Sequence, residues 1–122
     1  MTNLGTFGGL RSNALAINRD GKVVGWAQTS TSASHAFLWQ NGVIKDLGTL
    51  GANHSVAQGI GPLGQVVGFS RVQDGSVHAF VWENGVMSDL GSGVAYGVNR
   101  SVWIVGTAQK ASGNVATLWK PN

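Results

Sequence analysis

The stretch His35–Gly48 reads His-Ala-Phe-Leu-Trp-Gln-Asn-Gly-Val-Ile-Lys-Asp-Leu-Gly. It returns at residues 78–91 as His-Ala-Phe-Val-Trp-Glu-Asn-Gly-Val-Met-Ser-Asp-Leu-Gly, with ten of fourteen positions identical. A third copy is divided between the two ends of the chain. Residues 115–122 carry its first half, Val-Ala-Thr-Leu-Trp-Lys-Pro-Asn, and residues 1–5 carry its second half, Met-Thr-Asn-Leu-Gly. The chain is therefore an array of one sequence unit.

The unit recurs with a period of 43 residues, which brings Leu4-Gly5 onto Leu47-Gly48 and Leu90-Gly91. The third copy is shorter, because four steps separate Gly91 from Ala95 where nine separate Gly48 from Ala57. A period of about 40 to 50 residues is typical of propellers and related repeat folds. We predict a single repeat domain over 1–122, with units at about 6–48, 49–91, and 92–122 completed by 1–5.

Each unit contains four apolar segments whose alternation predicts strands. In the first copy these lie at 14–18, 22–27, 35–39 and 43–47. Asn41-Gly42 and Asn84-Gly85 separate the last two segments, and Asn-Gly favours a type I′ hairpin turn. The third copy has Lys120-Pro121-Asn122 at this place. A glycine in the middle of each second segment (Gly25, Gly68 and Gly106) indicates a bulge or a close backbone approach.

The composition supports a folded, all-β domain: 43% of the residues are hydrophobic, five are tryptophan, and only 11% are charged. Cysteine is absent, so no disulfide is expected. No apolar run is long enough for a membrane span, and the N-terminal residues do not resemble a signal peptide, so the compartment stays open. The eight basic residues are scattered rather than clustered, and we expect no nucleic-acid partner despite a net charge of +3.

The split third copy predicts how the array closes. Its fourth strand comes from Met1–Gly5, of the same chain or of a neighbour. Three four-stranded propeller blades are too few for a ring, so the preferred prediction is a homodimer with a six-bladed ring and terminal strand closure. The alternative is a monomeric threefold β-prism or β-trefoil.

The pattern Asp-Leu-Gly-Thr-Leu-Gly, Ala-x-Gly-Ile, Val-Val-Gly and His-Ala-Phe-x-Trp resembles the bacterial HAF repeat across essentially the whole chain. In the third copy Val115-Ala-Thr stands in place of His-Ala-Phe. The resemblance implies a propeller-like repeat protein, secreted or at the cell surface, and it carries no general activity.

The motifs that carry enzymatic chemistry are poorly matched. Gly59-Ile-Gly-Pro-Leu-Gly64 has the spacing of a dinucleotide-binding loop, but a strand pattern follows it instead of a helix. His35 and His78 share one repeat position that is Val115 in the third copy, which favours packing or a strand-edge hydrogen bond. Asp46, Asp89 and Asn3 likewise share a position and are interpreted as turn or strand-end caps. We therefore predict no catalytic residues, no metal site and no cofactor.

The remaining candidates are residues that do not repeat. Trp39, Trp82 and Trp119 recur and are predicted to pack between sheets, whereas Trp26 and Trp103 do not recur. The predicted ligand-contacting residues are Trp26, Arg11, Asn53, His54, Arg71 and Trp103, with loops at Gly8–Asn13, Gly51–Ser55 and Gly91–Val94. The sequence favours a non-enzymatic binding module for a carbohydrate or protein ligand. A scaffold without a small ligand is the alternative, and an enzyme is the least favoured class.

Overall fold

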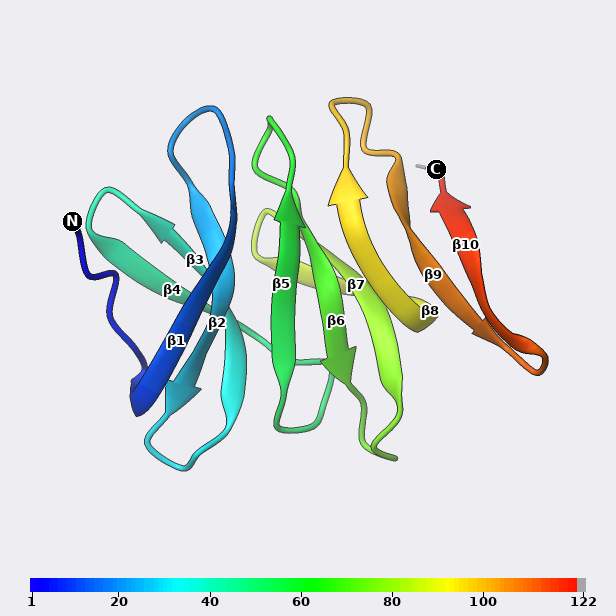
Figure 1. The fold of residues 1–122 in the computed structure, drawn as a ribbon, viewed down its shortest axis with the longest axis horizontal. Coiled ribbons are helices and arrows are strands. Elements are labelled where there is room, and N and C mark those ends of the chain that lie inside the picture. The colour runs from blue at the N-terminus through cyan, green and yellow to red at the C-terminus, as the bar shows by residue number, and fades with distance from the viewer. Residues whose placement is uncertain (121–122) are drawn as a thin grey trace.

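The computed structural model describes residues 1–120 and contains only β-strands as regular secondary structure (Figure 1). The strands are β1 (Gly8–Ile17), β2 (Val23–Thr29), β3 (Ser34–Gln40), β4 (Val43–Gly48), β5 (Ser55–Ile60), β6 (Val66–Arg71), β7 (Val77–Glu83), β8 (Val86–Val98), β9 (Ile104–Lys110) and β10 (Gly113–Trp119). They form a four-stranded sheet, β1-β2-β3-β4, and a six-stranded sheet, β10-β9-β8-β7-β6-β5, with every pairing antiparallel. The all-β prediction is confirmed.

The long strand β8 belongs to two groups of strands. Its first half pairs with β7 and its second half pairs with β9. We call β1–β4 unit 1, β5 to the first half of β8 unit 2, and the second half of β8 to β10 unit 3. The shortening after Gly91 explains this strand, because it removes the linker that separates β4 from β5. The prediction of a loop at Gly91–Val94 was therefore wrong.

The two predicted Asn-Gly hairpins are confirmed. Asn41 and Gly42 have φ angles of 51° and 86°, and Asn84 and Gly85 have φ angles of 54° and 86°. Positive φ at both central residues is what a type I′ turn requires. The corresponding turn of the third copy includes Pro121 and Asn122, which lie outside the described residues.

The glycine at the centre of each second strand lies against the backbone of the first strand. A Cβ atom on Gly68 would overlap the Val56 carbonyl oxygen, and one on Gly25 would overlap that of Asn13. The register of β5 with β6 shifts between Ala57 and Gly59, next to this contact. The predicted combination of a bulge and a close approach is confirmed.

Two apolar clusters join the units face to face. In the first, Val24, Ala36, Leu38 and Leu47 of unit 1 pack with residues of unit 2 that include Ala57, Val66, Phe80 and Trp82. The second contains Val67, Ala79, Val81 and Leu90 of unit 2 and Ala95, Val98, Ile104 and Trp119 of unit 3. The members from unit 2 in the second cluster stand 43 positions after those from unit 1 in the first. Trp82 and Trp119 pack between sheets as predicted, whereas Trp39 belongs to neither cluster.

The three units form a row (Figure 1). The N-terminal segment lies beside unit 1 and β10 lies at the other end, so the described residues 1–120 form no closed ring and no threefold closed arrangement. Within the described part of the chain, Met1–Gly5 forms no strand and β10 pairs only with β9. Closure by the chain's own N-terminus is therefore not what the structure contains. β1 begins at Gly8, so the predicted loop at Gly8–Asn13 is also a strand.

Candidate functional site

Two clefts open between neighbouring units near the turns that follow β1, β5 and β8. The first, which we call cleft 1, has a volume of about 410 Å³ between units 1 and 2. Its wall is formed by Lys22, Leu38, Gln40, Lys45, Leu63, Gly64, Trp82, Glu83 and Asn84. The second cleft, between units 2 and 3, has a volume of about 470 Å³.

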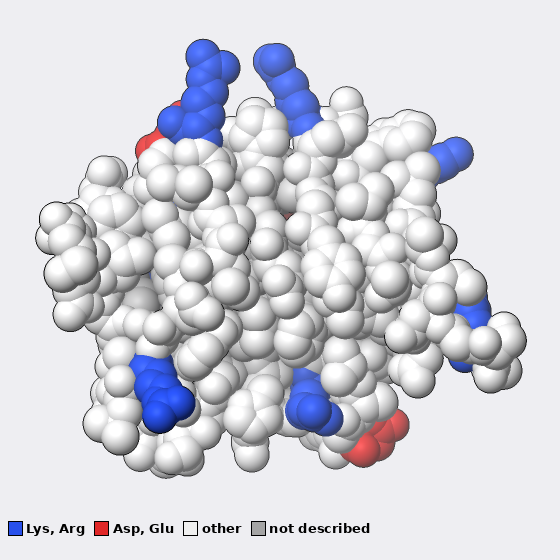
Figure 2. Space-filling model, viewed as in Figure 1, with Lys and Arg blue, Asp and Glu red and all other residues white. Residues whose placement is uncertain are grey.

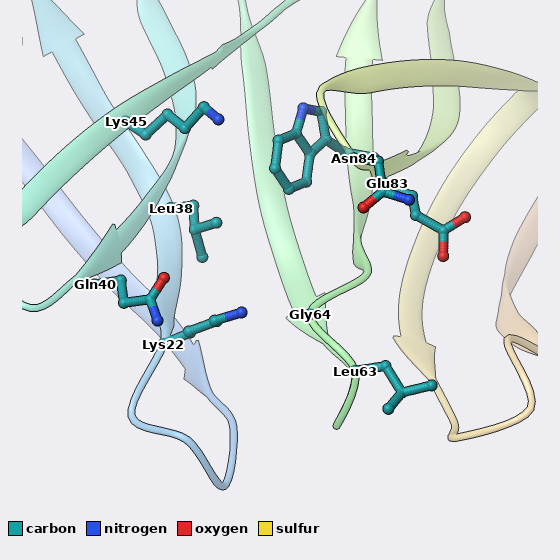
Figure 3. A pocket seen from close by; sticks show the side chains of 9 residues that line it. Lys22, Leu38, Gln40, Lys45, Leu63, Gly64, Glu83 and Asn84 are labelled. Atoms are coloured by element: carbon teal, nitrogen blue, oxygen red, sulfur yellow. The ribbon is translucent and has the colours of Figure 1, made fainter.

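The wall of cleft 1 from unit 1 is basic. Figure 3 shows the side chains of Lys22 and Lys45 extending from unit 1 toward unit 2, with Gln40 beside Lys22. The Lys45 Nζ atom lies 5.2 Å from the centre of the Trp82 ring, within the range of a cation–π contact. Trp82 is only 8% exposed, so it supports Lys45 more than it offers a free surface.

The wall from unit 2 carries hydrogen-bonding groups. The Gln65 Nε2 atom donates a hydrogen bond of 3.1 Å to Glu83 Oε2, and this carboxylate points away from the two lysines of unit 1 (Figure 3). The Gln65 side chain is buried, and among residues 1–120 its Oε1 atom has no hydrogen-bond partner. Asn84 adds an amide at the adjacent hairpin turn. Cleft 1 therefore combines two cations and two amides, from Lys22, Lys45, Gln40 and Asn84.

The polar residues of this end occupy equivalent repeat positions but differ in type. Lys22 corresponds to Gln65 and Trp103, and Gln40 corresponds to Glu83 and Lys120. In unit 2 the pair forms the hydrogen bond just described, whereas in unit 3 Lys120 Nζ lies 5.4 Å from the centre of the Trp103 ring. The backbone positions repeat, while the side chains at these positions differ from unit to unit.

The structure places three of the predicted ligand residues together, at the end of unit 2 opposite the β5–β6 turn. His54 Nδ1 accepts a hydrogen bond of 3.2 Å from the Ser34 N–H, and the His54 carbonyl accepts one of 2.9 Å from the Arg71 N–H. The Arg71 guanidinium donates to the Gly75 carbonyl at 2.7 Å. Asn53 is the exposed neighbour in the same linker. His54 and Arg71 thus fasten a linker and a turn.

The other three predicted residues lie elsewhere. Arg11 is exposed on β1, Trp26 is half-buried in β2 opposite Ala36, and Trp103 is in the β8–β9 turn. The six residues therefore do not form one site. Sequence reasoning missed Lys22, Gln40, Lys45, Glu83 and Asn84. The available signal was that several of these positions change character between copies of the repeat.

The repeated histidines and aspartates pair with each other across the outer hairpins. His35 Nδ1 lies 2.9 Å from Asp46 Oδ2, and His78 Nδ1 lies 2.9 Å from Asp89 Oδ2. Asp46 and Asp89 also accept hydrogen bonds of 2.8 Å from the N–H groups of Gly48 and Gly91. The predicted strand-edge hydrogen bond and strand-end caps are confirmed.

The environment of Asp89 lowers its pKa below the ordinary value of 3.8. Burial is the largest single influence and acts to raise the pKa, but the Gly91 N–H, the hydrogen bond to His78 and the charge of His78 together outweigh it. A carboxyl group whose pKa is lowered by folding stabilises the protein above the ordinary carboxyl range. That contribution is lost as the pH falls through the folded-state pKa.

The surface seen in Figure 2 carries isolated lysine and arginine side chains near its edges, without a continuous basic stripe. Among residues 1–120 there is no group of three or more His, Asp or Glu side chains with the spacing of a metal site. The described part of the chain contains no helix with the length and hydropathy to cross a membrane. Comparison of the chain with protein-family models, curated proteins and solved structures finds no match.

Proposed function

We propose that the protein is a non-enzymatic β-repeat binding module whose cleft 1 holds an acidic saccharide. The proposal includes membership of the HAF-repeat family and a propeller-like arrangement of its units. The observation that carries it is the convergence of Lys22 and Lys45 on one cleft that also holds the amides of Gln40 and Asn84. This end lies opposite the predicted loop at Gly51–Ser55.

The chemistry of cleft 1 matches a sugar acid. Ammonium groups attract a carboxylate, and the amides of Gln40 and Asn84 provide both donors and acceptors for sugar hydroxyls. Because both lysines extend from unit 1, a bound carboxylate would face unit 1, while the hydroxyls would meet Gln40 of unit 1 and Asn84 of unit 2.

Isothermal titration with an oligogalacturonate tests this proposal. We expect binding that weakens as salt rises, because a charge contact is screened. Removing one charge-assisted contact costs on the order of 1.4 kcal/mol, so Lys22→Gln and Lys45→Gln should each weaken binding by about tenfold.

Lys110→Gln is the matched control, because Lys110 is exposed at the end of β9 and is not among the residues that line cleft 1. It should leave the affinity unchanged. A neutral oligosaccharide of the same length should bind less tightly than the oligogalacturonate. Equal binding of the two sugars, or equal effects of all three lysine substitutions, would reject the acidic-saccharide assignment.

An interaction scaffold is the second candidate function. The observation that favours it is the exposure of apolar side chains at the two ends of the row, including Ile17 at 67% and Val105 at 50%. A scaffold would use these faces rather than cleft 1.

A further inference from the structure

The two ends of the row expose apolar sheet faces that correspond to buried faces inside the molecule. On unit 3, Val105, Ala116 and Leu118 stand at the repeat positions of Val24, Ala36 and Leu38. The latter three residues are at most 9% exposed because unit 2 covers them. Val105 and Leu118 are 50% and 45% exposed. We call Val105, Ala116 and Leu118 the rear face of unit 3.

Unit 1 exposes the complementary face. Ala14, Ile17 and Val23 occupy the positions of Ala57, Ile60 and Val66, the residues of unit 2 that pack against unit 1. We call Ala14, Ile17 and Val23 the front face of unit 1. A hollow of about 390 Å³ lies over this face, and Leu4 forms part of its wall. The two exposed faces thus carry the two halves of an interface that the molecule already forms between units 1 and 2.

The N-terminal segment already has the geometry of a strand end. Gly5 has a φ of 95°, close to the 83° of Gly48 and the 98° of Gly91. The Gly5 N–H donates to Asn3 Oδ1 at 2.9 Å, as Gly48 and Gly91 donate to Asp46 and Asp89. The Ser12 hydroxyl donates to the Gly5 carbonyl at 2.7 Å, just as Ser55 donates to Gly48.

These contacts hold Gly5 against unit 1 in the way that Gly48, at the end of β4, is held against unit 2. Between units 1 and 2, β4 then serves as the fourth strand of the preceding unit, unit 1. The preceding unit for Met1–Gly5 must be one that lacks a fourth strand and offers a free third strand. β10 of unit 3 meets this description, because it pairs only with β9 among the described strands. An unpaired apolar edge strand is a template for pairing with another chain.

The residues at the split positions are consistent with this pairing. In the two complete hairpins a histidine contacts an aspartate across the third and fourth strands. In the split copy both members of the pair change together, to Val115 and Asn3. Val115 could not pair with an aspartate as histidine does. Asn3 still accepts the hydrogen bond from the Gly5 N–H but carries no charge that needs a partner.

We infer that the protein assembles with a second copy of itself, head to tail. Met1–Gly5 of one copy pairs with β10 of the other, and the front face of unit 1 covers the rear face of unit 3. Two such contacts close a dimer of six units. The pairs Leu38–Lys45 and Phe37–Asp46 in unit 1 set the register. By the repeat, Leu118 of one copy lies opposite Thr2 of the other, and Thr117 lies opposite Asn3.

Cysteine cross-linking tests this register directly, because the chain contains no cysteine. Chains carrying Thr2→Cys are mixed with chains carrying Leu118→Cys, and the mixture is oxidised mildly. Directly opposed strand residues have Cβ atoms about 4.5–5.5 Å apart, near the span of a disulfide. We expect a disulfide-linked heterodimer, together with a native mass of two chains for the unmodified protein.

Val115→Cys provides the matched control, since Val115 lies on the same strand and is 42% exposed, close to the 45% of Leu118. It should cross-link with Thr2→Cys much more slowly. Equal rates for the two positions would indicate random collision and would overturn the inference. A native mass of one chain at micromolar concentration would also overturn it, as would a disulfide formed within one chain carrying both substitutions. None of these readouts depends on saccharide binding.

Discussion

Glycine at the centre of the second strand is required by a contact that no other residue allows. Gly68 lies where a Cβ atom would overlap the carbonyl oxygen of Val56 on the neighbouring strand. Gly25 and Gly106 meet Asn13 and Val94 in the same way. The bulge in the first strand brings its backbone into the space that a side chain would occupy. The glycine and the bulge therefore belong together.

Gly68→Ala tests this contact at the residue scale. We expect a loss of about 1–3 kcal/mol in the free energy of unfolding, because the neighbouring backbone must move. Chemical denaturation monitored by tryptophan fluorescence gives the value. Gly97→Ala is the control, since its Cβ would meet only the Val105 side chain at 3.5 Å and the first copy has Ala16 there. A cost for Gly97→Ala equal to that of Gly68→Ala would show that loss of glycine itself, and not the contact, matters.

At the scale of elements, one buried hydroxyl adds hydrogen bonds to the apolar cluster that joins units 1 and 2. The Ser55 hydroxyl donates to the Gly48 carbonyl at 2.6 Å and accepts from the Ala36 N–H at 2.8 Å. It thereby connects β5 to β3 and to the end of β4. The bulge between Ala36 and Phe37 leaves this N–H available. The side chain thus completes hydrogen bonds that the sheet itself does not make.

Ser55→Ala should cost about 1–3 kcal/mol, because it leaves the buried Ala36 N–H without a partner. Ser12 occupies the same repeat position but is exposed, and among the residues described its hydroxyl bonds to the Gly5 carbonyl alone. Ser12→Ala should change the stability of dilute protein by less than about 0.5 kcal/mol. Urea unfolding of both variants at low protein concentration measures the difference. Similar losses would mean that burial by the neighbouring unit does not set the cost.

The sequence predicts most of the elements but not their junctions. The Asn-Gly hairpins, the central glycines and the aspartate caps follow from local rules, so they were correctly placed. The continuous strand β8 was missed because a shortened linker changes how two strands join without changing their pattern. The residues of cleft 1 were missed for a different reason. Lys22 and Lys45 come together with Asn84 only when two sheets pack, and no spacing in the sequence encodes that approach.

At the scale of the whole molecule, each end of the row of units exposes an apolar face. Every internal junction buries a rear face against a front face, and the ends expose one of each. A heterologous contact of this kind either closes into a ring or continues as a fibre. Closure by two copies would pair β10 and cover both exposed faces, whereas continued addition would lead to aggregation. Assembly and solubility therefore depend on the same surface.

Leu118→Lys distinguishes a self-associating protein from a stable row of three units. Leu118 is 45% exposed in the single chain, so a lysine there should fold normally, yet it would place a charge in the proposed interface. Because association stabilises the folded state, the melting temperature of the unmodified protein should rise with its concentration. Leu118→Lys should abolish that rise and yield the mass of one chain. Val86→Lys, at a position 62% exposed on the outer hairpin of unit 2, should retain both properties. A melting temperature of the unmodified protein that does not change with concentration would show that the two faces do not mediate self-association.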